Sequence, residues 1–130
     1  MIERKIENIT FLGSVTQEIE TYYKDADCFL LVSTKEGVPT SVLEAMACGL
    51  PIVCSNVGGL GKLIIDDENG YVIDDFCVDS YVKKISILKT WQTLYYNISS
   101  NNKNKADKYK WEAVADNVTS NMRQAIQVEN

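Results

Sequence analysis

The sequence contains no histidine and no cluster of basic residues. The missing histidine excludes nucleophilic catalysis by a Ser–His or Cys–His pair and removes the most common metal ligand. The net charge is −5, and a chain without a basic stripe is not expected to bind nucleic acid. No apolar run reaches the roughly 18 residues of a membrane-spanning helix, so we expect no transmembrane segment. The opening residues, MIERKIENI, lack the apolar core of a signal peptide, and we predict a cytoplasmic protein.

Cysteine is also sparse, with four residues and no C-x-x-C spacing among them. Cys28 and Cys54 lie inside apolar runs, where a free cysteine behaves as a small hydrophobic residue. We therefore predict reduced, structural thiols, as is usual for a cytosolic protein. Zinc would need ligands that this pattern does not supply, so we expect no metal site.

A chain of 130 residues is long enough for one domain with its own core. Apolar runs that predict strands alternate with segments that predict helices, which favours an α/β fold with a Rossmann-like parallel sheet and helices on both faces. The expected strands are 9–12, 28–32, 50–54 and 71–73. The expected helices are 14–24, 39–49, 60–65, one beginning near residue 79, and a last one at 110–127 after a polar break at 99–104.

Short motifs predict where two of these helices begin and where one ends. Ser14 opens an S-x-x-Q sequence and Ser41 opens S-x-x-E, and both patterns are typical of a capping box at a helix start. Gly49 stands where a helix commonly ends in the left-handed conformation. On the last helix Val114, Val118, Met122 and Ile126 recur at every fourth residue and predict an apolar face.

The most informative segment is EGVPTSVLEAMACG, residues 36–49, in which Glu36 and Glu44 have seven residues between them. The order predicts a loop that enters a helix, and a helix start offers unpaired N–H groups that suit a phosphate. A carboxylate on either side suits sugar hydroxyls, because an ionised acid can accept from two O–H donors. The plainer alternative makes Glu36 a solvated loop residue and Glu44 only the partner in a capping box. In a parallel sheet, ligands bind beyond the carboxyl ends of the strands, where the loops 33–40 and 56–61 are expected.

The pattern S-x-x-E-G-x-P-x-x-x-L-E-A-M-A-x-G-x-P-I-V at 33–53 resembles the donor-site signature of retaining GT-B glycosyltransferases of family 4. F-L-G at 11–13, Y-x-x-A-D at 23–27, V-G-G at 57–59, N-G at 69–70 and Y-x-W at 109–111 resemble further parts of that family. The resemblance implies the C-terminal, nucleotide-sugar-binding part of a GT-B fold. It implies a hexose donor linked to UDP or GDP, and neither a metal nor another cofactor.

The resemblance also implies a role for each matched position. Glu36 would be the catalytic-site acid that contacts hydroxyls of the donor sugar, and Glu44 would hold both ribose hydroxyls. The remaining positions would surround the diphosphate or line the pocket: Ser33, Gly37, Val38, Pro39, Thr40, Ser41, Gly58 and Gly59.

Two departures from the family pattern affect what we expect of the chain. Members commonly carry proline and glutamate where this sequence has Gly61 and Lys62, and Lys62 is either a surface lysine or a positive charge near the diphosphate. The acceptor domain and the opening of the donor domain have no counterpart in residues 1–130, and Arg4 and Lys5 are not assigned the diphosphate role. We therefore expect a partial C-terminal domain, inactive alone, whose acceptor domain is supplied elsewhere. A non-catalytic α/β remnant or interaction domain that pairs with another chain stays open as an alternative, while a GT-B epimerase or a receiver-like module is disfavoured.

Overall fold

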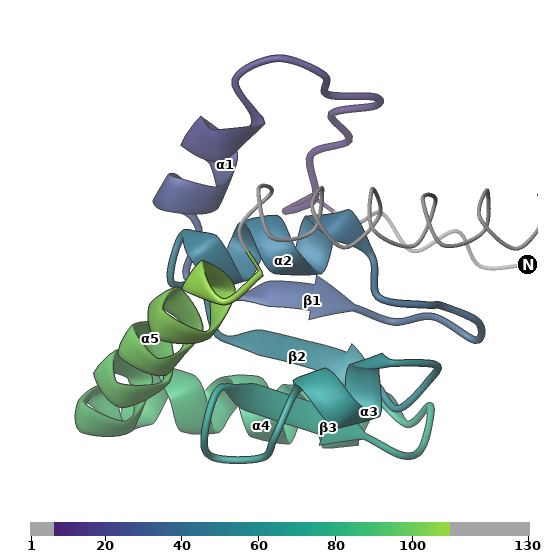
Figure 1. The fold of residues 1–130 in the computed structure, drawn as a ribbon. Helices are drawn as coiled ribbons and strands as arrows, with labels where there is room; N and C mark the ends of the chain where they lie inside the picture. The colour runs from purple at the N-terminus through teal and green to yellow at the C-terminus, as the bar shows by residue number, and fades with distance from the viewer. Residues whose placement is uncertain (1–6, 110–130) are drawn as a thin grey trace, which may run out of the picture.

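The computed structural model describes residues 7–109 and contains a parallel sheet with the strand order β1-β2-β3 (Figure 1). Its elements, in chain order, are α1 (Ile19–Asp25), β1 (Phe29–Leu31), α2 (Thr40–Ala47), β2 (Ile52–Ser55), α3 (Leu60–Leu63), β3 (Gly70–Ile73), α4 (Val78–Thr90) and α5 (Gln92–Asp107). The register aligns Leu30 of β1 with Val53 of β2, and Val53 with Tyr71 of β3. The predicted parallel α/β sheet is confirmed over these residues.

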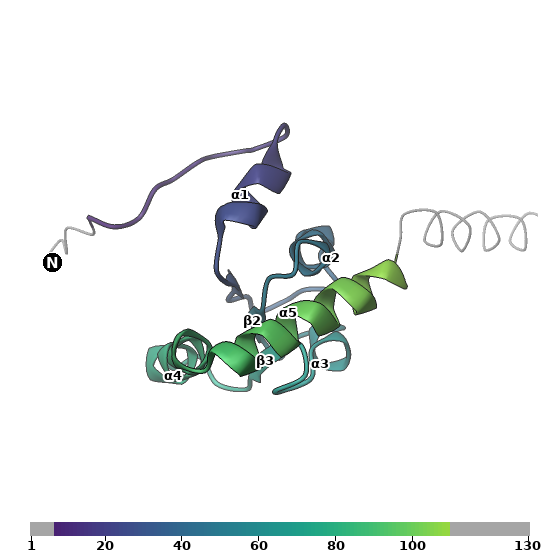
Figure 2. The same cartoon turned by 90° about the vertical axis from the view of Figure 1, so that its left-hand side faces the viewer.

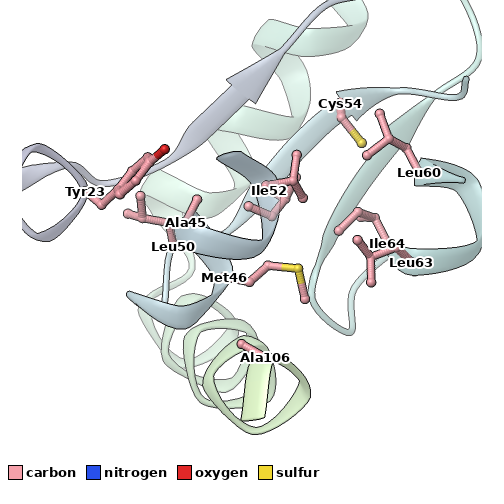
Figure 3. Packing of buried hydrophobic residues seen from close by; sticks show 11 residues of the cluster. Tyr23, Ala45, Met46, Leu50, Ile52, Cys54, Leu60, Leu63, Ile64 and Ala106 are labelled. Atoms are coloured by element: carbon pink, nitrogen blue, oxygen red, sulfur yellow. The ribbon is translucent and has the colours of Figure 1, made fainter. Parts of the chain in front are cut away.

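The central strand β2 is buried along its whole length because helices cover both faces of the sheet. On one face Ile52 and Cys54 pack in a cluster that includes Met46 of α2 and Leu60 of α3 (Figure 3). On the other face Val53 belongs to a second cluster with residues of β3, α4 and α5. Figure 2 shows the sheet end-on, with α2 and α4 on its two sides. The prediction of helices on both faces is therefore confirmed.

Helix α5 ties together the amino ends of all three strands. The Tyr95 hydroxyl donates to the carbonyl of Asp27, just before β1, at 2.8 Å. The side-chain amide of Asn102, which is fully buried, donates to the carbonyls of Leu50 and Asn69, just before β2 and β3, at 2.7 and 2.8 Å. The two bonds from Asn102 satisfy buried carbonyls, whereas the bond from Tyr95 lies at the surface. Because α5 packs at the amino ends of the strands, we expect a ligand site at their carboxyl ends, where ligands of parallel sheets bind.

The predicted strand at 9–12 is wrong, because residues 9–12 form no strand and Phe11 is 92% exposed. A strand needs a neighbour to satisfy its backbone groups, and the only strands described in residues 7–109 are β1, β2 and β3. The following helix exists but begins at Ile19 rather than Ser14. Its N-cap is Glu18 in the left-handed conformation, with no side-chain cap, so the S-x-x-Q sequence forms no capping box.

The predicted polar break at 99–104 is also wrong, since α5 continues through it to Asp107. Ile98, Asn102 and Ala106 recur at every fourth residue and are buried, so a polar asparagine occupies an inward position of the helix. The predicted left-handed Gly49 after α2 is confirmed, with φ of 78°. The last predicted helix, 110–127, lies outside the described residues.

All four cysteines are free thiols in the structure. Burial raises the pKa of both Cys28 and Cys54 to about 11, which disfavours the reactive thiolate at neutral pH. Cys54 contributes to the core beside Ile52, as expected for a structural cysteine. Within residues 7–109, no helix combines the length and apolarity needed to cross a bilayer.

Candidate functional site

Two loops at the carboxyl ends of β1 and β2 pack against each other. The N–H of Gly59, in the loop after β2, donates to the carbonyl of Gly37, in the loop after β1, at 3.3 Å. Gly58 has a φ of +54°, and a Cβ at this position would overlap the carbonyl oxygen of Glu36. Gly58 is thus needed for the close approach of the two backbones, and this contact fixes where Glu36 and Gly37 lie.

Ser33 and Glu36 form a polar pair on the first of these loops. The Ser33 hydroxyl lies 3.2 Å from Oε1 of Glu36, and both residues are half-buried. The Ser33 N–H donates to Oγ of Ser55 at 2.8 Å, and Ser55 is buried at the end of β2. The hydroxyl of Tyr81, on α4, donates to the same Oγ at 3.3 Å. The loop that carries Glu36 is therefore anchored to the sheet and to α4.

Helix α2 begins at Thr40 directly after this loop, with Pro39 as its N-cap and no side-chain cap. Ser41 lies inside the first turn, and the predicted S-x-x-E capping box is not formed. The first turn also contains no acidic residue. A helix start with no side-chain cap and no acid in its own first turn can direct unbonded N–H groups and the positive end of its dipole at an anion.

Glu44 lies one turn further along α2, and its carboxylate faces α1. Oε2 of Glu44 accepts a hydrogen bond from the Tyr23 hydroxyl at 3.0 Å. Burial, followed by the hydrogen bond and charge of Glu44, raises the pKa of Tyr23 to about 12, so the phenol stays protonated at neutral pH. Glu44 thus acts neither as a capping-box partner nor as a freely solvated side chain.

The contacts bring together six of the ten predicted site residues: Ser33, Glu36, Gly37, Val38, Gly58 and Gly59. Pro39, Thr40 and Ser41 follow in sequence at the start of α2, and Glu44 is held separately by α1. Lys62 is exposed on α3. Within the described part of the chain, no three His, Cys, Asp or Glu residues are grouped to hold a metal ion.

Three residues that support the site were not predicted from the sequence as part of it: Ser55, Tyr81 and Tyr23. A signal existed for Ser55, because a serine at the end of an otherwise apolar buried strand points to a hydrogen-bonded role. No local signal identified Tyr81 or Tyr23 as partners, since each meets its partner through a contact between distant segments.

The sequence profile of the family described as glycosyl transferases group 1 matches residues 2–105. The chain belongs to this glycosyltransferase family. It is 33% identical over 109 residues to an uncharacterized glycosyltransferase of Methanocaldococcus jannaschii, an alignment that covers 82% of this chain and 28% of that protein. The chain thus spans less than a third of the length of that relative.

Two solved structures share the fold of this chain. A sucrose-phosphate synthase from Thermosynechococcus elongatus superposes with a TM-score of 0.80 at 27% identity, covering 92% of this chain and 30% of that one. HepE of Anabaena, whose structure contains UDP-glucose, superposes with a TM-score of 0.66 at 20% identity, covering 82% of this chain and 29% of HepE. The glycosyltransferase chain described here therefore has the GT-B type of Rossmann-like fold.

Proposed function

We propose that this chain is the nucleotide-sugar-binding part of a retaining hexosyltransferase of GT-B family 4, with a UDP- or GDP-linked donor. One observation carries the proposal: the paired loops place Ser33, Glu36 and Gly58 beside the uncapped start of α2. An anchored acid next to an open helix start provides acceptors for sugar hydroxyls and donors for phosphate oxygens.

Each part of the donor then has a place in this arrangement. The backbone of residues 37–41 faces the diphosphate, with Gly37, Val38 and Pro39 leading into Thr40 and Ser41 at the start of α2. Glu36 accepts from hydroxyls of the donor sugar, and Ser33 helps to hold its carboxylate. Glu44 accepts from the two ribose hydroxyls, while Gly58 and Gly59 complete the wall of the pocket.

The chemistry of this site is stabilisation of a leaving nucleoside diphosphate. Negative charge builds on the diphosphate as the bond to the sugar breaks, and preorganised N–H donors at the start of α2 stabilise that charge. Neither histidine nor a metal is needed for such stabilisation. The UDP-glucose bound by HepE, a protein of the same fold, supports the nucleotide-sugar part of the proposal.

The acceptor-binding domain or chain lies outside these 130 residues, and we propose that the whole protein is cytoplasmic. The relatives' greater length supports a separate acceptor-binding region, because the chain corresponds to 28% of the M. jannaschii protein and 30% of the sucrose-phosphate synthase.

We expect the purified 130-residue chain to transfer no sugar from UDP-glucose or GDP-mannose to oligosaccharide or lipid acceptors while still binding UDP and GDP weakly. A radiolabelled transfer assay and titration calorimetry measure the two properties. Measurable sugar transfer would contradict the proposal that acceptor binding requires a region outside this chain. Binding of neither UDP nor GDP would contradict the proposed donor site.

The exposed edge of the sheet supports a second candidate function, an α/β interaction domain that pairs with another chain. Among the described strands β1 has β2 as its only neighbour, so its other edge presents unpaired backbone groups. Leu30 of β1 lies on the α4 side of the sheet and is 49% exposed, while Val53 beside it is fully buried. A cavity of about 560 Å³ lined by Cys28, Ile85 and Tyr95, among others, begins next to this strand.

When no other partner is present, a second copy of the chain can pair with the free edge of β1. We expect light scattering coupled to gel filtration to show concentration-dependent self-association that Leu30→Asp reduces, because the charge would lie in the apolar contact. Ile65→Asp is a matched control, since Ile65 is similarly exposed at 45% but lies beyond α3. Equal effects of the two substitutions, or a monomer at every concentration, would contradict self-association through the β1 edge.

A further inference from the structure

The contact between Tyr23 and Glu44 joins a buried aromatic residue to an acid of the proposed site. Tyr23 is the buried residue of α1, with 9% of its surface exposed, and its ring packs against Phe29 with centroids 6.1 Å apart. The ring also belongs to the core cluster that includes Ala45 and Met46 of α2 (Figure 3). Its hydroxyl donates to Oε2 of Glu44 at 3.0 Å. The phenol is therefore held rigidly, whereas Glu44 is half-exposed.

A glutamate on a helix surface samples several rotamers, and restricting it on ligand binding costs conformational entropy. A hydrogen bond to a fixed phenol restricts the carboxylate before the ligand arrives, which reduces that cost. The bond leaves acceptor capacity free, because each carboxylate oxygen has two lone pairs and Oε1 is not used by Tyr23. Glu44 can thus accept from Tyr23 and from two neighbouring hydroxyls at the same time.

We infer that Tyr23 is a positioning residue for nucleotide binding, which orients the Glu44 carboxylate toward the ribose hydroxyls of the donor. The inference rests on the proposed function, in which Glu44 holds the ribose. The raised pKa of Tyr23, about 12, supports it, because the phenol remains a donor across the physiological pH range. It also gives α1 a functional role, since α1 carries the group that fixes an acid on α2.

The test is a double-mutant cycle on UDP affinity in the full 130-residue chain, measured by titration with NMR detection. Tyr23→Phe keeps the packed ring and removes only the hydroxyl, and we expect UDP affinity to fall about threefold to tenfold. In a Glu44→Ala background the same substitution is expected to change nothing further. Tyr22→Phe is the matched control, because Tyr22 lies on the same helix and is 49% exposed. The control is expected to bind UDP like the original chain.

A second readout separates positioning from a merely structural effect, even if Tyr23→Phe is partly unfolded. Positioning predicts that Tyr23→Phe reduces the preference for UDP over 2′-deoxy-UDP, because the ribose contact itself is weakened. A structural effect would lower both affinities equally and leave their ratio unchanged, which would overturn the inference. Unchanged UDP affinity in Tyr23→Phe would also overturn it. If Glu44→Ala itself leaves UDP affinity intact, the ribose assignment in the proposed function fails instead.

Discussion

Replacement of Glu44 by alanine is expected to remove most of the affinity of this chain for UDP or GDP. In the proposed site its carboxylate accepts from both ribose hydroxyls, and hydrogen bonds to a charged group contribute about 1.5–3 kcal/mol each. Loss of at least one such bond corresponds to a decrease in affinity of about tenfold to 150-fold. Titration calorimetry or NMR titration with UDP measures this change directly.

The matched control for Glu44→Ala is Glu68→Ala, which removes the same charge from an exposed turn between α3 and β3. The control is expected to bind UDP with the affinity of the original chain. An equal decrease for both variants would mean that net charge, rather than contact with the ribose, governs binding. Undiminished affinity in Glu44→Ala would contradict the role of this acid.

The second large effect is expected from Gly58→Ala, which should both destabilise the fold and abolish nucleotide binding. Alanine is strained at a φ of +54°, and its Cβ would overlap the backbone carbonyl of Glu36. The loop carrying Glu36 must then move away from the loop after β2, which breaks the bond from the Gly59 N–H to the Gly37 carbonyl. We expect the free energy of unfolding, measured by urea denaturation, to fall by about 2–4 kcal/mol, in the range of other strained backbone substitutions.

Gly37→Ala distinguishes loss of the fold from loss of the site. A Cβ on Gly37 would meet no atom within 4 Å, and its φ lies outside the left-handed region. We therefore expect the stability of Gly37→Ala to match that of the original chain within about 0.5 kcal/mol. Its nucleotide affinity should still fall, because the proposed diphosphate approaches the backbone at this position. A strong loss of stability in Gly37→Ala, or none in Gly58→Ala, would contradict the loop packing described here.

The central α/β unit could be predicted from the sequence because its signals are local. Leu50–Cys54 is apolar without alternation and corresponds to β2, which is buried on both faces. Pro39 and Gly49 bracket α2, and the structure places the helix between them. The same local signals place the two loops of the candidate site at one edge of the sheet, where Gly37 and Gly59 meet.

The rest could not be predicted because it depends on contacts between distant segments. Asn102 looks like part of a polar break, yet it is buried because it bonds to carbonyls 52 and 33 residues away. Glu44 fits a capping box by spacing, yet its partner is Tyr23, 21 residues earlier. Phe11 looks like a strand residue, but strand propensity has no effect without a neighbouring strand. Local propensity therefore predicted the elements better than the partners of their polar side chains.

The most direct test of the donor site is an NMR titration of the isotope-labelled chain with UDP-glucose, which follows every backbone amide separately. The proposed site predicts that the largest shift changes occur at Glu36, Gly37, Thr40 and Ser41, and at Gly58 and Gly59 across the loop contact. Amides at the opposite end of the sheet, such as those of Asn69 and Asn102, should change little. Shift changes confined to that opposite end, or none at millimolar UDP-glucose, would contradict a nucleotide-sugar site at the start of α2.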